Sequence, residues 1–152
     1  MDMPNPDPST RLKSFLREAG LKSTRLRGGE RSIPFVGRTR EWMYVARMDA
    51  DWLNLYVMVC ALPDETGLRA RLFQTVAALN AKIRLAKFSE SGGRLILEVD
   101  YRAEHLDAAV LGNLVGLLHS IAEEHYPRIF RVVTGDEVLD ALAPQLPRPE
   151  AA

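Results

Sequence analysis

The sequence contains one cysteine, Cys60, among 152 residues. A single cysteine excludes an intramolecular disulfide framework and is typical of proteins in a reducing compartment. Cys60 stands within an apolar strand pattern, so we interpret it as a small core residue in preference to a reactive thiol. We therefore expect a cytoplasmic protein whose fold depends on packing alone.

Long apolar runs are also lacking. No stretch approaches the eighteen consecutive apolar residues that a membrane-spanning helix needs. The first eight residues, with proline at positions 4, 6 and 8, have neither the charged start nor the apolar run of a signal peptide. We expect residues 1–8 to be a disordered tail, residues 9–142 a single domain, and residues 143–152 a proline-rich tail.

Motifs for catalysis or cofactor binding are absent from the sequence. Neither Gly28-Gly29 nor Gly92-Gly93 belongs to a phosphate-binding loop, and no nucleophile elbow is present. Asp49 and Asp51 flank a turn, where aspartate is favoured for backbone reasons, and we prefer that interpretation to a pair of catalytic carboxylates. The sequence therefore predicts a protein that is not an enzyme and binds no cofactor.

The histidines give no metal site. His105, His119 and His125 do not have the spacing of two metal ligands on one helix, and no cysteine or carboxylate cluster completes a site. His119 and Glu123 are four residues apart on a predicted helix, and we interpret them as a solvated pair on its polar side. We predict no bound metal.

Net charge is zero, but the charges are unevenly distributed along the chain. From Arg11 to Arg40 nine basic residues face two acidic ones, whereas from Glu98 onward ten acidic residues face four basic ones. The two ends can neutralise each other in the fold or an oligomer, or the basic end can be kept for an acidic partner. The candidates for such contacts are Arg25, Arg27, Arg31, Arg38 and Arg40.

These arginines also suit nucleic acid, because Phe35, Trp42 and Tyr44 stand nearby in the sequence for base stacking. Against this, the isoelectric point is 6.8 and no nucleic-acid-binding motif is present. An acidic protein segment is the preferred partner, with nucleic acid as the alternative.

Alternating apolar residues predict five strands. An edge strand is expected near residues 33–36, because proline at position 34 is tolerated only at an edge. Two strands follow at residues 42–48 and 52–62. The second is apolar on both sides, which predicts a central strand covered on both faces. Residues 83–101 read as a hairpin that turns at Ser91-Gly92-Gly93.

Three main helices are predicted: one before the strands, one between the third and fourth strands, and one after the last strand. The first is capped by Ser9 or Thr10 and ends at Gly20, and the second runs over residues 64–80 with Asp64 as its cap. The third starts near residues 103–106 and is broken or kinked at Pro127, with one more brief helix at residues 136–142. The order α-β-β-β-α-β-β-α predicts an α+β fold, an antiparallel sheet packed with helices.

Residues 80–126 carry a recognisable pattern. Helix 64–80 ends at Asn80, Lys87-Phe88 precedes the turn, and an apolar-alternating return strand leads into a long leucine-rich helix. This pattern resembles the YbjN family, which shares its fold with the class I type III secretion chaperones. The resemblance covers about residues 10–133. It implies a small, dimeric, non-enzymatic protein that binds other proteins.

The resemblance also implies which residues make contacts. The dimer would use Phe73, Ala77, Asn80, Ile83 and Leu85, and the client surface would use Leu12, Phe15, Leu16, Tyr44 and Tyr56. The chaperones are typically acidic, whereas this chain is neutral with a basic first third, which favours the broader YbjN-like class. We therefore predict a chaperone-like or adaptor homodimer in a stress or regulatory context. A nucleic-acid-associated protein is the alternative, and a small-molecule sensor domain is a third interpretation.

Overall fold

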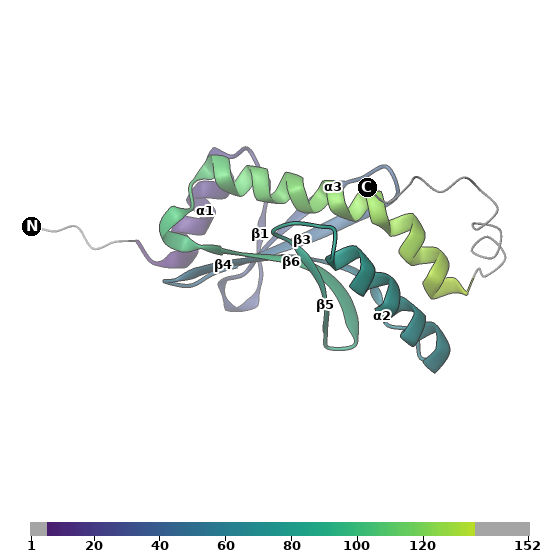
Figure 1. The fold of residues 1–152 in the computed structure, drawn as a ribbon. Helices are drawn as coiled ribbons and strands as arrows, with labels where there is room; N and C mark the ends of the chain where they lie inside the picture. The colour runs from purple at the N-terminus through teal and green to yellow at the C-terminus, as the bar shows by residue number, and fades with distance from the viewer. Residues whose placement is uncertain (1–5, 136–152) are drawn as a thin grey trace, which may run out of the picture.

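A six-stranded antiparallel sheet carries the helices on one side (Figure 1). The computed structural model describes residues 6–135, so the predicted helix at residues 136–142 lies outside the described residues. The strand order is β1-β2-β3-β4-β6-β5. The elements are α1 (Pro8–Glu18), β1 (Thr24–Arg25), β2 (Arg31–Val36), β3 (Glu41–Met48), β4 (Trp52–Ala61), α2 (Thr66–Asn80), β5 (Lys87–Ser91), β6 (Arg94–Arg102) and α3 (Ala108–Thr134). Short 3-10 turns occupy Arg27–Gly29 and Ala103–His105.

The predicted α+β class is confirmed, with one strand more than expected. The extra strand, β1, pairs only with the first two residues of β2. Beyond them, from Ile33 to Val36, β2 is the outermost strand. Pro34, which has no N–H to donate to a neighbour, therefore lies at the edge that the sequence predicted.

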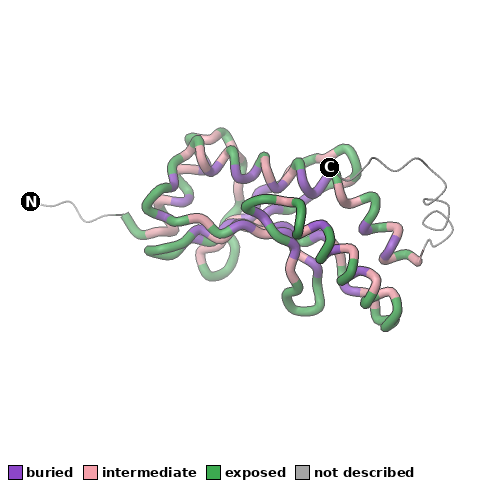
Figure 2. Tube along the Cα trace, viewed as in Figure 1, coloured by how far each residue is buried: buried purple, intermediate pink, exposed green. Residues whose placement is uncertain are grey.

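One continuous hydrophobic core lies between the sheet and the helices. Along β3 and β4 every second side chain is buried, as the alternation predicts. On α1 the buried residues are Leu12 and Leu16, and α3 contributes a long stripe from Leu111 to Val132. Figure 2 shows buried positions along the sheet and on the sides of α1 and α3 that face it. α2 lies beside the C-terminal part of α3, at the end of the sheet where β5 lies (Figure 1).

Within residues 6–135 no helix covers the second face of the sheet, which corrects the prediction for β4. This strand is central in the sheet, but Trp52 and Met58 on its outer side are 45% and 36% exposed. Two apolar sides indicated a covered strand, yet α1 and α3 both pack on the same face. We call the uncovered side the open face of the sheet.

The helix starts differ from the predicted ones. Asp7, not Ser9 or Thr10, caps α1 by accepting the Thr10 N–H at 2.8 Å, and Pro8 opens the helix, where its missing N–H costs nothing. Glu65, not Asp64, caps α2: its side chain accepts hydrogen bonds from the backbone N–H groups of Gly67 and Leu68. The sequence thus predicted a capped start for both helices but assigned the cap to the wrong residue in each.

The third helix and the hairpin also need correction. α3 begins after Asp107, whose side chain accepts the Val110 N–H, so it starts later than residues 103–106. It continues through Pro127 to Thr134 as one helix, and Figure 1 shows it bending in its last third. The first strand of the hairpin begins at Lys87 instead of Ile83. The turn itself is as predicted: Gly92 and Gly93 have φ of 59° and 78°, the left-handed conformation of a two-residue hairpin.

No helix within residues 6–135 is both long and apolar enough to cross a bilayer.

Candidate functional site

The open face of the sheet carries a broad hollow of about 900 Å³. Its floor comes from β4 and β6 and its sides from β3 and β5. The apolar side chains of the floor are Trp52, at the start of β4, and Tyr56, Met58 and Ile96; Asn54, Glu98 and Asp100 lie on the same strands. Trp52 and Met58 stay 45% and 36% exposed here, and exposed apolar side chains gathered on one surface make it a candidate contact site. The shape is a shallow trough over strands, suited to an extended chain more than to a compact ligand.

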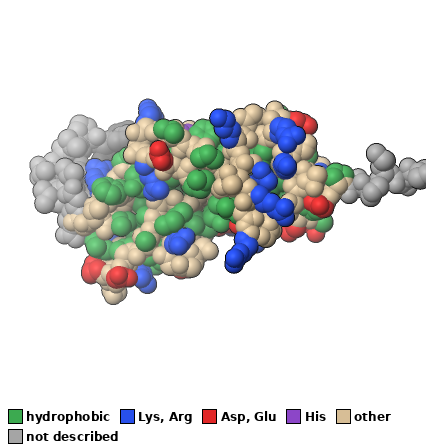
Figure 3. Space-filling model, turned by 180° about the vertical axis from the view of Figure 1, so that it is seen from behind, with side chains coloured by type: hydrophobic (Ala, Val, Ile, Leu, Met, Phe, Trp, Pro, Cys, Tyr) green, Lys and Arg blue, Asp and Glu red, His purple; other side chains and the backbone are tan. Residues whose placement is uncertain are grey.

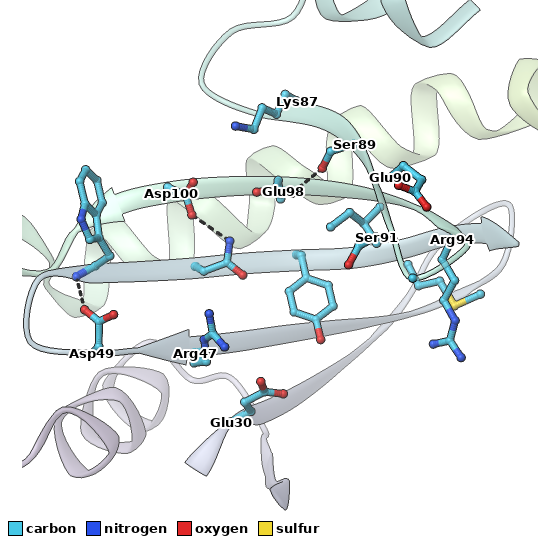
Figure 4. Close-up of a pocket in the computed structure, with 16 residues that line it drawn as sticks. Glu30, Arg47, Asp49, Lys87, Ser89, Glu90, Ser91, Arg94, Glu98 and Asp100 are labelled. Atoms are coloured by element: carbon cyan, nitrogen blue, oxygen red, sulfur yellow. Dashed lines mark hydrogen bonds between the residues drawn. The ribbon is translucent and has the colours of Figure 1, made fainter. Parts of the chain in front are cut away.

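Charged side chains of both signs line the same hollow, some of them on the floor strand β6 (Figure 4). The acidic ones are Glu30, Asp49, Glu90, Glu98 and Asp100, and the basic ones are Arg47, Lys87 and Arg94. Asp100 accepts a hydrogen bond from Asn54 at 2.8 Å, and Glu98 accepts one from the Ser89 hydroxyl. Burial raises the pKa of Tyr56, and the nearby charge of Glu30 raises it further. The hydroxyl of Tyr56 therefore stays protonated at neutral pH and can donate a hydrogen bond.

Tyr56 is the predicted client-surface residue that the structure places in the trough. The prediction is wrong for Leu12, Leu16 and Tyr44, which are 0%, 1% and 0% exposed and belong to the core. Phe15 is half-buried against that core, with the Arg11 guanidinium 5.7 Å from its ring centre. The helix stripe that looked like a contact surface instead fastens α1 to the sheet.

Sequence reasoning missed Trp52, Met58 and Ile96 as surface residues. For Trp52 and Met58 the signal was present, because β4 carries apolar residues on both sides; Ile96 stands alone on the otherwise charged outer side of β6. That pattern fits a strand covered on both faces and equally a strand with one face kept for a partner. Only the placement of the helices separates the two cases.

A second exposed apolar surface lies on α2. The small residues Ala70, Ala77 and Ala81, together with Phe73, are all exposed on the side away from the core, and we call this stripe the outer face of α2. The ring of Phe73 is 42% exposed. Leu85, a few residues beyond the helix, is 75% exposed and has a φ of +67°, a conformation that a leucine rarely adopts. Leu85 is therefore a second exposed apolar side chain close in sequence to α2.

Two of the predicted dimer residues have internal roles. The side-chain amide of Asn80 donates to the carbonyl of Phe88 at 2.9 Å and accepts its N–H at 2.7 Å. Asn80 therefore occupies the outer edge of β5, where a neighbouring strand would otherwise bond. Ile83 is partly buried against the core. Phe73, Ala77 and Leu85 remain available for a contact with another molecule.

The pair formed by His119 and Glu123 is not solvated, which corrects the prediction. Glu123 is 8% exposed and accepts hydrogen bonds from Trp42 Nε1 at 2.6 Å and from the backbone N–H groups of Arg38 and Thr39 at 3.1 and 3.0 Å. His119 Nδ1 shares a hydrogen bond of 2.9 Å with the Tyr44 hydroxyl. The two side chains fasten α3 to β3 and to the turn between β2 and β3.

The pKa values in this cluster follow from its hydrogen bonds. Burial alone would raise the pKa of Glu123, but the hydrogen bonds from Trp42 and Thr39 outweigh it, so the pKa lies below its ordinary value. For Tyr44, burial raises the pKa and the charge of Glu123 adds to that rise. At neutral pH the cluster therefore holds one carboxylate and a neutral phenol.

The five candidate arginines do not form one surface. Arg25 and Arg27 are exposed at one end of β2, where Arg31 also bonds to Ser23, whereas Arg38 and Arg40 flank its other end. Arg40 is half-buried: it donates to the Val59 carbonyl at 2.8 Å and lies 4.4 Å from the Trp42 ring centre. The aromatic residues expected to stack on bases, Phe35, Trp42 and Tyr44, point into the core. Seen from behind, basic side chains nevertheless gather over the N-terminal half of the molecule (Figure 3).

The remaining reactive groups are few. Cys60 is half-buried against the core, and burial raises the pKa of its thiol to about 11. Within residues 6–135 there is no group of three or more histidine, cysteine or carboxylate side chains placed to hold a metal ion.

Comparison with known proteins identifies similar folds among solved structures but no match by sequence. Neither a protein-family model nor a curated protein sequence matches the chain. Solved structures do match. YbjN from E. coli superposes with a TM-score of 0.58 at 9% identity, over 79% of this chain and 92% of its own.

Two further matches come from protein complexes. A chain of the ExsC–ExsE complex gives a TM-score of 0.54 at 17% identity, over 78% of this chain and 90% of its own. A chain of the heterodimeric ExoU–SpcU complex, from the type III secretion system of Pseudomonas aeruginosa, gives a TM-score of 0.53 at 15% identity. The match covers 79% of this chain and 95% of the other. The chain therefore has the fold shared by YbjN and the type III secretion chaperones, as its hairpin and long helix implied.

Proposed function

We propose that the protein is a non-enzymatic, chaperone-like adaptor that binds an extended segment of another protein in the trough on the open face of the sheet. The observation that carries this proposal is the exposure of apolar side chains along a central strand, where Trp52 at the start of β4 and Met58 further along it are 45% and 36% exposed. Two of the matching folds come from complexes with a partner protein, which supports the same assignment.

The chemistry of the trough defines the segment that fits. An extended chain presents alternate side chains to a sheet, so apolar residues at every second position would lie on Tyr56, Met58 and Ile96. The rim has five acidic and three basic side chains, so it favours a segment whose outer positions are mixed in charge with an excess of basic residues. A stress or regulatory setting, in which such segments become exposed, fits this role.

The second element of the proposal is a homodimer formed through the outer face of α2. Phe73 is the only large side chain of that face, and the three alanines around it allow another helix to approach closely. Leu85, 75% exposed and five residues beyond the end of α2, is a second candidate for this contact. Because Asn80 already bonds the outer edge of β5 at Phe88, the contact would use side chains of α2 in preference to added strand pairing.

The client site is tested with the two tryptophans. Trp42 is 2% exposed and Trp52 is 45% exposed, so iodide quenches only the fluorescence of Trp52 in the free protein. Adding a peptide that alternates apolar and basic residues should protect Trp52 from iodide and should reduce aggregation of a chemically denatured reporter protein. A Tyr56→Asp/Met58→Asp variant should lose both effects, whereas Ala109→Asp, at an exposed position in the first turn of α3, should keep them. Equal behaviour of the two variants would refute the site.

The dimer is tested by sedimentation equilibrium. Phe73→Asp should give a monomer that keeps the wild-type melting temperature, because Phe73 lies outside the core of the single chain. Gln74→Asp is the matched control, since it adds the same charge at the next exposed position of α2 beside the apolar stripe. A wild-type protein that stays monomeric at high concentration would refute the dimer and leave the client site untouched.

A further inference from the structure

One flank of α1 carries basic side chains without an acidic one. Lys13 and Arg17 are exposed and follow Ser9 at spacings of four residues, so the three lie on one side of the helix. Glu18, the acidic residue of α1, lies about 100° further around the helix, on the other flank of the buried stripe. The charge on the Ser9 flank is therefore purely positive.

This flank faces the segment that returns from α1 to the sheet. After the helix, the Leu21 N–H donates to the Leu16 carbonyl at 2.9 Å. Further along, a Cβ atom on Gly29 would lie 3.4 Å from Oγ of Ser9. Residues 21–29 thus run back from the C-terminal to the N-terminal end of α1, on its Ser9 side.

Two arginines oppose each other where this segment joins the sheet. Arg25 and Arg31 are directly opposite in the pairing of β1 with β2. Arg31 stands two residues before the buried Ile33, so both arginines point to the helix side of the sheet. The Ser23 hydroxyl accepts a hydrogen bond from Nε of Arg31 at 2.9 Å and holds it there. Directly opposed like charges destabilise a sheet, so this pair favours a bound anion.

Together these side chains form a surface that we call the basic edge. It comprises Lys13, Arg17, Lys22, Arg25, Arg27 and Arg31. Figure 3 shows basic side chains gathered on this N-terminal half of the molecule. Within residues 6–135 none of the six forms an ion pair with a carboxylate, and none lines the trough. Glu30, which follows Arg27–Gly29, lines the trough instead.

Asp7 is a carboxylate close to the basic edge. Its pKa is lowered, mainly by the hydrogen bonds from Thr10 and to a smaller extent by the positive charge of Arg25. One carboxylate that already caps α1 leaves most of the positive charge of the six cations uncompensated.

An exposed apolar side chain lies among these cations. Leu26 is 37% exposed and stands between Arg25 and Arg27. The one aromatic residue in positions 8–31 is Phe15, which is half-buried against the core, whereas single-stranded nucleic acid binds best where exposed rings can stack on bases. Cations around an exposed leucine therefore fit an acidic protein segment better than a phosphate backbone.

We propose that the basic edge binds an acidic segment of a partner protein, one that carries apolar side chains among its carboxylates. The carboxylates pair with the cations of α1, β1 and β2, and an apolar side chain covers Leu26. Because no residue of the basic edge lines the trough, both sites can be filled at once, and the protein then joins this partner to its client. The joining rests on the proposed client site, whereas binding at the basic edge does not.

Binding is tested by fluorescence anisotropy with the full chain and a labelled peptide that repeats Glu-Glu-Leu. Lys13→Glu/Arg17→Glu/Arg25→Glu should weaken binding at least about tenfold, because attraction becomes repulsion at three positions. If that variant melts at a lower temperature than the wild type, Lys13→Gln/Arg17→Gln/Arg25→Gln replaces it and should weaken binding at least about threefold. Unchanged affinity in a folded variant would overturn the proposal.

The matched control is Lys82→Glu/Arg84→Glu/Arg128→Glu. It changes the net charge equally, at exposed positions after α2 and in the last third of α3. At about 0.15 M salt, charges more than about 8 Å apart are largely screened, so this variant should bind the peptide within about twofold of the wild type. Equal weakening by the two triple variants would show an effect of net charge alone and would overturn the site.

Three further probes define the partner. A peptide with glutamine in place of glutamate should not bind, and one with serine in place of leucine should bind more weakly, since nothing then covers Leu26. An oligothymidylate strand of the same charge should also bind more weakly. A serine peptide that binds as tightly as the leucine peptide, or an oligonucleotide that binds more tightly, would overturn the assignment to an acidic segment with apolar side chains.

The two sites are separated by their own variants. Tyr56→Asp/Met58→Asp should bind the Glu-Glu-Leu peptide like the wild type, because neither residue belongs to the basic edge. The charge-reversed basic edge should still allow a client peptide to protect Trp52 from iodide. If no peptide protects Trp52 while the acidic peptide binds, the client site and the joining fail and the basic edge stands. Loss of acidic-peptide binding in the trough variant would overturn the separation of the two sites.

Discussion

Replacing Glu123 by alanine should destabilise the protein measurably, because its carboxylate joins α3 to two other parts of the fold. It accepts hydrogen bonds from the indole of Trp42 and from two consecutive backbone N–H groups in the turn between β2 and β3. These partners are more than eighty residues away in the sequence. The side chain therefore stabilises a contact that no local interaction replaces.

The magnitude follows from what each donor loses. Trp42 is 2% exposed, so its indole N–H would be left buried without a partner, at a cost of about 1–3 kcal/mol. Arg38 and Thr39 are exposed, so water can replace the carboxylate, and each lost bond costs only about 0.5 kcal/mol. The free energy of unfolding should fall by about 2–4 kcal/mol, which lowers the melting temperature by roughly 6–12 °C for a chain of this size.

The assay is thermal unfolding followed by circular dichroism at neutral pH, with Glu124→Ala as the control. Glu124 has the same chemistry one residue further along α3, but its side chain is 74% exposed, and its ion-pair contact among the described residues is with His125 at 3.9 Å. The control should melt within about 1 °C of the wild type, as is usual for an exposed substitution. If Glu123→Ala melts together with Glu124→Ala, the three hydrogen bonds do not contribute as argued.

The same carboxylate gives a pH dependence of known sign. The pKa of Glu123 is lower in the folded chain than its ordinary value, so the folded state holds the carboxylate ionised more strongly than the unfolded state does. Its contribution is therefore present above the unfolded pKa of about 4.3 and is lost as the pH falls through the lower folded pKa. Unfolding measured between pH 6 and pH 3 should show a smaller loss of stability in Glu123→Gln than in the wild type. An identical slope would contradict this assignment.

Three further predictions use the same structure. Gly37→Ala should destabilise the fold, because its Cβ would lie 1.6 Å from Oε1 of Glu123; the cost should shrink when Glu123→Ala is added, and strict additivity of the two unfolding free energies would exclude the clash. Cys60 should react with a thiol reagent slowly at pH 8 and faster toward pH 11, since its pKa is about 11; a fast reaction at pH 8 would contradict its burial. Leu12→Ala should lower the free energy of unfolding by about 2–5 kcal/mol, because this residue is fully buried. If the variant is as stable as the wild type but no longer binds a client peptide, Leu12 belongs to the contact surface and not to the core.

The sequence predicted most of the fold because the strands alternate cleanly. β3, β4 and β6 each bury every second residue, so their positions and the hairpin turn could be read directly. Strand β1 could not, because a two-residue strand has no periodicity. Nor could the start of the hairpin: apolar residues from Ile83 to Phe88 continue the alternation, but Leu85 adopts a positive φ that interrupts the strand.

The candidate contacts were harder to predict, since they depend on which side of each element another element covers. The α1 stripe of Leu12 and Leu16 is equally suited to a core and to a client, and the structure assigns it to the core. The spacing of His119 and Glu123 was visible, but a helix pattern cannot tell that Trp42, from a distant strand, donates to Glu123. Long-range hydrogen bonds leave no periodic signal in one sequence.

For β4, counting the helices would have corrected the interpretation. A sheet of five or six strands needs two long helices to cover one face, and the sequence predicts three helices besides the brief one at residues 136–142. Since α2 lies at the β5 end of the sheet, α1 and α3 are the two that remain, and both pack on the same face. The apolar residues on the other side of β4 then have no partner within the described chain. That surplus, which includes Trp52 and Met58, is the reason to expect an extended segment of another protein on this face.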